Sequence, residues 1–364
     1  MSAGRVYNFS AGPAVLPVSV LEKAASEMLN FNGSGMGIME MSHRTPVWEG
    51  VMKKTEDDVR KLLDIPANYK VLFHEGGATH QFSAIPLNLL GDKKKADYIV
   101  TGTWSKKAAA EAKRYGEVNI IGGQTPFNKL PDLKDAKFSP DAAYVYYCDN
   151  ETIEGVEFRE PPTLPYPEIP LVADMSSNFM SKKLDISKFG VIYSCAQKNY
   201  APAGLTLMII REDLLEIPPH PLTPTIMMNK TQAANGSMYN TPATYNIYIA
   251  GLTFEWILGL GGLEKLEELN KKKAMMLYDY IDSSNYYRNP VQKEHRSFMN
   301  VTFLGPEKLD TKDFQAEAKK IGLVSLGGHR SVGGFRASIY NAMPIEGVEK
   351  LIEFMKKYAA EHPF

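Results

Sequence analysis

Two charged residues stand directly after apolar runs, where buried strands would end. Asp174 follows PLVA, and Lys198 follows VIYSCAQ. In open α/β sheets, ligands bind beyond the carboxyl ends of the strands, so both side chains are expected at one crevice. Desolvation there lowers the pKa of a lysine and frees its amine to attack a carbonyl group. Asp174 is then either the structural ion-pair partner of Lys198 or part of a catalytic site.

The catalytic alternative is a site for pyridoxal phosphate (PLP). In such a site the lysine forms a Schiff base with the cofactor's aldehyde. The aspartate keeps the pyridine nitrogen protonated, so that the ring accepts electrons from a Cα carbanion. The site also requires a cradle for phosphate, an aromatic side chain against the ring and cations for the substrate's carboxylate.

Candidates for the cradle and the aromatic contact follow other apolar runs. In HEGGATHQF a Gly-Gly turn precedes Ala78 and Thr79, whose amides could open a helix directed at phosphate. Trp104 lies in TGTWS, and Thr152 in CDNETIEG offers a hydroxyl for the cofactor. A Gly-Gly turn alone is often only a turn, and a tryptophan fits a core equally well. The repeated placement of such residues after strand ends is what indicates a cofactor site.

Candidate cations lie in two glycine-rich segments. Arg44 follows NGSGMG and a histidine, and His329, Arg330 and Arg336 stand among the four glycines of GGHRSVGGFR. Arginine binds carboxylate or phosphate through paired charge-assisted bonds, each contributing about 1.5–3 kcal/mol. A lone arginine is usually a surface residue, but two arginines and a histidine in one bent segment indicate a dianionic ligand.

The elements that must position these residues alternate between strands and helices. Continuous apolar strands between helices predict an α/β fold with a mostly parallel sheet covered on both faces. We expect an N-terminal segment near the active site (1–15), a large domain (16–258) and a smaller C-terminal α+β domain (259–364). Helices are expected at residues 17–29, 45–63, 263–280, 314–321 and from 344 onward. Strands are expected at residues 71–73, 98–100, 118–121, 143–147, 171–173, 191–193, 205–210, 299–303 and 335–339.

Composition narrows the functional class. The 364 residues include 41 Lys+Arg and 42 Asp+Glu, a balance that argues against nucleic acid or an anionic membrane as the main partner. The two cysteines cannot form a disulfide framework, and no metal site is predicted. Phosphate-loop, dinucleotide and serine-hydrolase motifs do not occur. Residues 247–263 are expected as a buried helix rather than a membrane span. The first residues lack an apolar run, so a cytoplasmic location is expected.

Nine stretches spread from residue 9 to residue 342 resemble the phosphoserine aminotransferase family. These enzymes are class-V, PLP-dependent aminotransferases of fold type I. The stretches are FSAGPAVLP, MSHRT, EGGATHQF, TGTWSKKA, CDNETIEG, ADMSSN, CAQKNYAPAG, MYNTPATY and GGHRSVGGFRASIYNA.

The resemblance implies roles toward the cofactor. Lys198 would carry the Schiff base and shuttle the proton between Cα and C4′, Asp174 would pair with the pyridine nitrogen, and Trp104 would stack on the ring. Asn240 and Thr241 would reach the phosphate of the neighbouring subunit's cofactor, which implies an obligate homodimer with shared active sites. The remaining cofactor contacts would come from Ala78, Thr79, Thr152 and Gln197.

The resemblance also implies the substrates. Arg336 would hold the α-carboxylate, and Ser10 would contact the substrate carboxylate. The phosphate of phosphoserine, or the side-chain carboxylate of glutamate, would be bound by Arg44, His329 and Arg330. The reaction would be ping-pong amino transfer from L-glutamate to 3-phosphohydroxypyruvate, giving O-phospho-L-serine and 2-oxoglutarate in serine biosynthesis.

One position departs from the family pattern. Many members have Arg-Gly where this chain has Thr79 and His80, so a cation near the substrate phosphate is absent or supplied by protonated His80. We therefore expect a weaker phosphate grip that tightens at lower pH. The alternatives are another PLP enzyme of this fold, a nicotinamide-dependent oxidoreductase, or a non-catalytic binding protein on the same scaffold.

Overall fold

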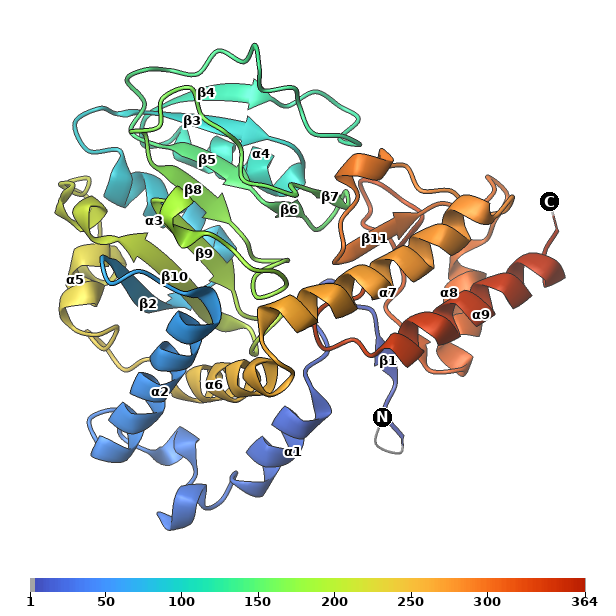
Figure 1. The fold of residues 1–364 in the computed structure, drawn as a ribbon, viewed down its shortest axis with the longest axis horizontal. Coiled ribbons are helices and arrows are strands. Elements are labelled where there is room, and N and C mark those ends of the chain that lie inside the picture. The colour runs from blue at the N-terminus through green and yellow to red at the C-terminus, as the bar shows by residue number, and fades with distance from the viewer. Residues whose placement is uncertain (1–3, 364) are drawn as a thin grey trace.

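A seven-stranded sheet forms the centre of the computed structural model, which describes residues 4–363. Its strand order is β2-β10-β9-β8-β5-β3-β4, and Figure 1 shows helices on both sides of it. All neighbouring pairs are parallel except those of β10, which runs antiparallel to β9 and β2. The predicted mostly parallel α/β fold is confirmed. The strands are β2 Tyr69–Gly76, β3 Lys95–Val100, β4 Glu117–Gly122, β5 Val145–Cys148, β8 Leu171–Asp174, β9 Val191–Cys195 and β10 Gly204–Arg211.

Alternate residues of the strands supply two apolar layers. Tyr98 and Val100 belong to the layer that contains residues of helices α3 and α4, whereas Ile99 between them belongs to the layer with helices α2 and α6. Because both faces are covered, β5 and β9 are buried along their whole length. The helices of this part are α1 Val18–Ser26, α2 Pro46–Leu63, α3 Ala78–Leu89, α4 Thr103–Ala112, α5 Asn229–Ala234 and α6 Thr244–Gly259.

The end of one expected helix and the start of another differ from the structure. The helix expected at 314–321 spans Thr311–Lys320, because Asp310 caps its first turn. Helix α2 begins at Pro46, and the hydroxyl of Thr45 accepts a hydrogen bond from the amide of Trp48 at 3.3 Å. Helix α1 ends at Ser26, short of the expected residue 29. The chain changes direction there, so Leu29, expected on the buried face, is 83% exposed.

The C-terminal residues build a second apolar cluster around Phe314 and Phe335. Strand β1 pairs in parallel with β12, and Phe9 lies inside the same cluster, so the N-terminal segment packs against the C-terminal part. Figure 1 shows the N-terminal segment lying beside the C-terminal part. The predicted boundaries at residues 15 and 258 stay predictions. The elements are β1 Tyr7–Asn8, α7 Leu263–Ser283, β11 Asn300–Phe303, α8 Thr311–Lys320, β12 Leu323–Val324, β13 Phe335–Ser338 and α9 Ile345–Glu361.

A small hairpin connects the two parts. It consists of β6 Asn150–Glu151 and β7 Val156–Glu157, and it follows β5 directly. Both strands are buried although most of their residues are polar.

Between residues 4 and 363, no single helix is long and apolar enough to cross a membrane. Helices α6 and α7 meet the length and hydropathy criteria only together, across a bend of 87°. Helix α6 places Ile247, Phe254 and Ile257 in the core, as expected of a buried helix.

Candidate active site

One pocket gathers most of the predicted cofactor residues at the carboxyl edge of the sheet. The strands β3, β5, β8 and β9 are parallel, so the residues that follow them meet at this edge. The pocket has about 480 Å³ of empty space. Its predicted lining residues are Ala78, Thr79, Trp104, Thr152, Asp174, Gln197 and Lys198.

Lys198 points toward the turn of the hairpin. Its Nζ donates to Thr152 Oγ1 at 2.7 Å and lies 5.9 Å from the centre of the Trp104 ring. No ion pair joins it to Asp174 among the residues that the structure describes, which argues against the purely structural pairing. Burial acts to lower the pKa of Lys198, but Tyr340, Cys195 and Asp174 raise it, and the balance lies above the ordinary value. The expectation of a lowered pKa is therefore wrong for the protein alone.

Asp174 is a buried carboxylate at the end of β8. Its Oδ1 accepts a hydrogen bond from the amide of Ser176 at 2.9 Å, and its Oδ2 accepts one from the Tyr193 hydroxyl at 3.1 Å. Burial raises its pKa, while the Ser176 contacts and the charge of Lys198 act in the opposite direction. The two hydrogen bonds fix the carboxylate where it can meet a positively charged group in the pocket.

The expected phosphate cradle is the start of α3. Gly76 has φ +94°, and a Cβ there would lie 2.9 Å from His80 Nδ1, so the turn requires glycine. The first-turn amides of Ala78 and Thr79 have no helical partners and can bind an anion. His80 is not part of the pocket lining, and its Nδ1 lies 3.1 Å from the carbonyl oxygen of Glu75.

Four buried polar atoms at the site have no hydrogen-bond partner within the described protein. They are Trp104 Nε1, Asn150 Oδ1, Gln197 Oε1 and Arg336 Nε. Such groups are rare in folded proteins and are usually satisfied by water or a ligand. Their concentration here fits a polar ligand.

The N-terminal segment closes one side of the pocket. The amide of Ala14 donates to the carbonyl oxygen of Gln197 at 2.9 Å. A Cβ on Gly12 would lie 3.4 Å from Lys198 Cγ, so this segment runs against the lysine side chain. Ser10 lies in the same turn, where its hydroxyl accepts from the amide of Gly12 at 3.3 Å.

The predicted cations of the C-terminal segment lie beside the pocket. Arg336 on β13 donates through Nη1 to the carbonyl oxygen of Thr152 at 3.2 Å. Burial lowers the pKa of His329, and so do the nearby positive charges of Arg336, Arg330 and Lys107. Arg336, Arg330 and Lys107 therefore form a positively charged rim, which disfavours the protonated form of His329.

Lys107 was not predicted from the sequence. Its Nζ lies 4.6 Å from the centre of the Trp104 ring. The available signal was its position three residues after Trp104 in TGTWSKKA, which places both on one face of a helix.

Seven predicted site residues are not part of this pocket's lining; besides Ser10, His329, Arg330 and Arg336, described above, they are Arg44, Asn240 and Thr241. Arg44 is exposed before α2, and Asn240 and Thr241 lie in the segment before α6. The Arg44 guanidinium makes no ion pair with any residue in the range 4–363. Within one chain the structure does not bring these three residues to Lys198.

Further lining residues were missed by the sequence reasoning. Asn150 donates to Ser177 Oγ at 2.7 Å and to Asn300 Oδ1 at 2.8 Å, linking the pocket to β11. The available signal was adjacency, because every missed residue lies within a few positions of a predicted one. The missed lining residues are Gly77, Cys148, Asn150, Ser176, Ser177 and Cys195.

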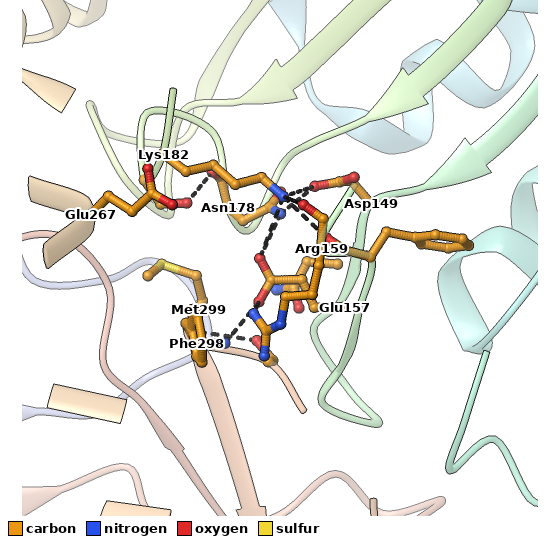
Figure 2. Close-up of polar contacts among 12 residues, drawn as sticks. Asp149, Glu157, Arg159, Asn178, Lys182, Glu267, Phe298 and Met299 are labelled. Atoms are coloured by element: carbon orange, nitrogen blue, oxygen red, sulfur yellow. Dashed lines mark hydrogen bonds and ion pairs between the residues drawn. The ribbon is translucent and has the colours of Figure 1, made fainter. Parts of the chain in front are cut away.

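A buried charge network anchors the hairpin that carries Thr152, as Figure 2 shows. Lys182 Nζ lies 3.2 Å from Asp149 Oδ2 and 3.9 Å from Glu157 Oε1. Glu157 Oε2 also accepts a hydrogen bond from the amide of Phe298 at 2.7 Å. The base of the hairpin is thus tied both to the large sheet and to the C-terminal part.

Comparison with known proteins also leads to a PLP-dependent aminotransferase. The family model for class-V aminotransferases matches residues 6–351. The phosphoserine aminotransferase of Nitrosomonas europaea is 54% identical over 98% of this chain and 99% of its own length. The solved PLP-bound phosphoserine aminotransferase of Trichomonas vaginalis is 46% identical, with a TM-score of 0.93 over 97% of this chain and 100% of the other. The enzyme structure from Bacillus circulans subsp. alkalophilus is 42% identical, with a TM-score of 0.95 and 99% coverage of both chains.

Nearly full-length similarity and a pocket that unites Lys198 with Asp174 lead to one conclusion. The chain belongs to the class-V aminotransferases and, within them, to the phosphoserine aminotransferase family.

Proposed function

We propose that this chain uses PLP to transfer the amino group of L-glutamate to 3-phosphohydroxypyruvate, giving O-phospho-L-serine and 2-oxoglutarate in serine biosynthesis. The carrying observation is the placement of Lys198, Thr152 and Asp174 in one pocket, with Lys198 Nζ hydrogen-bonded to Thr152 at 2.7 Å. The cytoplasmic location expected from the sequence is part of the same proposal.

The residues present fit the cofactor. When bound, PLP supplies an aldehyde that condenses with amines and a ring that withdraws electrons from Cα. The first-turn amides of Ala78 and Thr79 would hold its phosphate. Trp104 would cover the ring, and the fixed carboxylate of Asp174 would hold a proton on the pyridine nitrogen.

Lys198 is the group assigned to proton transfer. Its amine would take the Cα proton of the amino donor, a task that requires the neutral amine. Thr152 Oγ1 fixes the position of Nζ in the free protein. In the free protein the pKa of Lys198 lies above its ordinary value, so the neutral amine is disfavoured there.

The cationic rim is assigned to the substrate's anions. Arg336 keeps a buried Nε without a partner, so a carboxylate could bind it through two parallel bonds. His329 and Arg330 precede it on the bent segment, and Lys107 faces them from α4. We assign these three groups to the phosphate of phosphoserine or the side-chain carboxylate of glutamate, and Ser10 to a carboxylate at the pocket wall.

A homodimer completes the assignment. Arg44, Asn240 and Thr241 match the family's site stretches but lie outside the pocket of their own chain. We therefore assign them to the pocket of a neighbouring subunit, Arg44 for the substrate's anion and the other two for the cofactor's phosphate.

A visible absorption spectrum of the purified protein tests the proposal. With PLP bound we expect an absorption band that shifts to shorter wavelength on addition of phosphoserine. A band that responds to glutamate but not to phosphoserine would overturn the substrate. Absence of any band after incubation with PLP would overturn the cofactor. The Lys198→Ala variant is the control, because it removes the amine that produces the protein-linked band.

A further inference from the structure

The first turn of α4 carries Trp104 and is held by carboxylates of the β6–β7 hairpin. Glu151 Oε2 accepts a hydrogen bond from the amide of Trp104 at 3.0 Å, and its Oε1 accepts one from the amide of Ser105 at 2.9 Å. Glu154 Oε1 accepts one from the amide of Thr103 at 3.0 Å. The first three amides of α4, which a helix leaves without internal partners, are therefore all bonded to this hairpin.

The packing around Glu151 is close. The side chain is fully buried, and Oε1 also accepts a hydrogen bond from the Ser105 hydroxyl. A Cβ on Gly102 would lie 2.5 Å from Glu151 Cδ, so no larger residue fits at the helix start without moving the carboxylate. The carboxylate thus fixes the helix end directly, without an intervening side chain.

No cation neutralises this carboxylate among the ion pairs of residues 4–363. The carboxyl group is instead bound by the two amides and the hydroxyl at the positive end of the α4 dipole. Burial raises the pKa of Glu151, and so does neighbouring Glu154, whereas the bonds from Ser105 and Trp104 lower it. A buried acid without a cationic partner depends on its hydrogen bonds, so these contacts hold Glu151 in one position.

Thr152, the residue after Glu151, indicates the role of these contacts. Thr152 Oγ1 accepts the hydrogen bond from Lys198 Nζ, and Nζ lies 5.9 Å from the Trp104 ring centre. Consecutive residues of the hairpin, Glu151 and Thr152, therefore contact the helix turn that carries the ring and the lysine amine.

We propose that Glu151 is a positioning residue whose carboxylate sets the Trp104 ring against the cofactor while Thr152 sets Lys198. The inference rests on the proposed function only for the identity of the cofactor. It predicts that weakening the Glu151 contacts loosens the first turn of α4 and, through Trp104, the grip on PLP.

The Glu151→Gln variant tests the proposal. The amide keeps the size of the side chain, but in either orientation its NH₂ faces one of the two backbone N–H groups. The matched control is Asp310→Asn, since Asp310 accepts from the amides of Lys312 and Asp313 at the start of α8, and none of these residues lines the pocket.

Two quantities are measured for both variants and the parent: amide hydrogen exchange of the helix starts in the apoprotein, and the dissociation constant of PLP by equilibrium dialysis. In Glu151→Gln we expect exchange at residues 103–105 to be about tenfold faster and the dissociation constant to rise about tenfold. In Asp310→Asn, exchange should accelerate at residues 312 and 313 only, with PLP affinity unchanged.

Faster exchange with unchanged PLP affinity would overturn the proposal, because Glu151 would then be only a helix cap. Weaker affinity with unchanged exchange would also overturn it. If Glu151→Gln does not fold, Ser105→Ala removes one of the three donors, and the same two readouts must move in the same direction by a smaller factor. If the parent binds PLP but does not convert phosphoserine, the proposed function fails while this inference is still tested by both readouts.

Discussion

Removal of the Lys182 ammonium tests the network that anchors the hairpin. Its side chain is 15% exposed and lies between Asp149 and Glu157, whose side chains are 1% and 2% exposed. Burial acts to lower the pKa of Lys182, but the two carboxylates raise it, so the group is charged at neutral pH. The Lys182→Met variant keeps the length of the side chain and removes the charge.

The size of the effect follows from what the variant leaves behind. Removing one partner of a buried ion pair costs about 3–5 kcal/mol, because the remaining charge is uncompensated. Glu157 retains Arg159 Nη1 at 3.1 Å, and Asp149 Oδ1 retains the Tyr147 hydroxyl at 3.0 Å. The loss in the free energy of unfolding should therefore lie near the lower limit, at about 3 kcal/mol.

The neighbouring residue provides the control. Lys183 is 53% exposed and pairs with Glu264 at 3.1 Å, also on the surface. Surface pairs contribute about 0–1 kcal/mol, so Lys183→Met should change stability by no more than that. Urea unfolding of both variants and the parent, followed by circular dichroism at pH 7.5, measures the difference.

Equal stability of the two variants would refute the reasoning, because it would mean that water or chain movement compensates Asp149 as well as Lys182 does. A loss in Lys182→Met with unchanged PLP affinity would support the stability argument but show that the hairpin base does not affect the pocket.

Three further outcomes are expected. Lys198→Ala should abolish multiple turnover while the protein still folds, and measurable transamination by the variant would contradict the proton-transfer role. Lys107→Ala should raise KM for phosphoserine several-fold, whereas Lys106→Ala should not; equal effects would show that general surface charge, not the rim, attracts the substrate. Burial lowers the pKa of Lys273 to about 7, whereas the unfolded chain keeps the ordinary lysine pKa of 10.5, so the unfolded state binds more protons between these values. The free energy of unfolding should therefore rise from pH 7 to 9, by up to about 1.4 kcal/mol per unit, in the parent but not in Lys273→Met. Urea unfolding at each pH measures the difference. If stability changes with pH equally in the parent and in Lys273→Met, the carbonyl oxygens bonded to Nζ, such as that of Tyr340 at 2.8 Å, keep the ammonium charged.

The sequence predicted the central sheet because strands covered on both faces are continuous apolar runs. Asp174 and Lys198 were recognisable because each follows such a run. The β6–β7 hairpin could not be recognised in this way, since it is short and its buried residues are mostly polar. Its burial depends on partners far away in the sequence, such as Lys182 and the amide of Phe298.

The predictions of a lowered pKa for Lys198 and of a first helix that continues to residue 29 were wrong for related reasons. The local sequence indicates desolvation, but the opposing charges come from Asp174 and other elements that only the fold brings near. Apolar periodicity extends to Leu29, whereas the helix ends where the chain turns away at Ser26.

The pairing of β1 with β12 has a consequence for the order of events during synthesis. Residues 7 and 8 leave the ribosome long before their partners at residues 323 and 324. Domains generally fold in the order in which they emerge, so the large sheet can form while this segment still lacks its partner. Ala14, which bonds to Gln197, lies only a few residues from β1, so the pocket wall can be secured only late. A nascent chain stalled before β12 should therefore have its sheet but not its finished pocket.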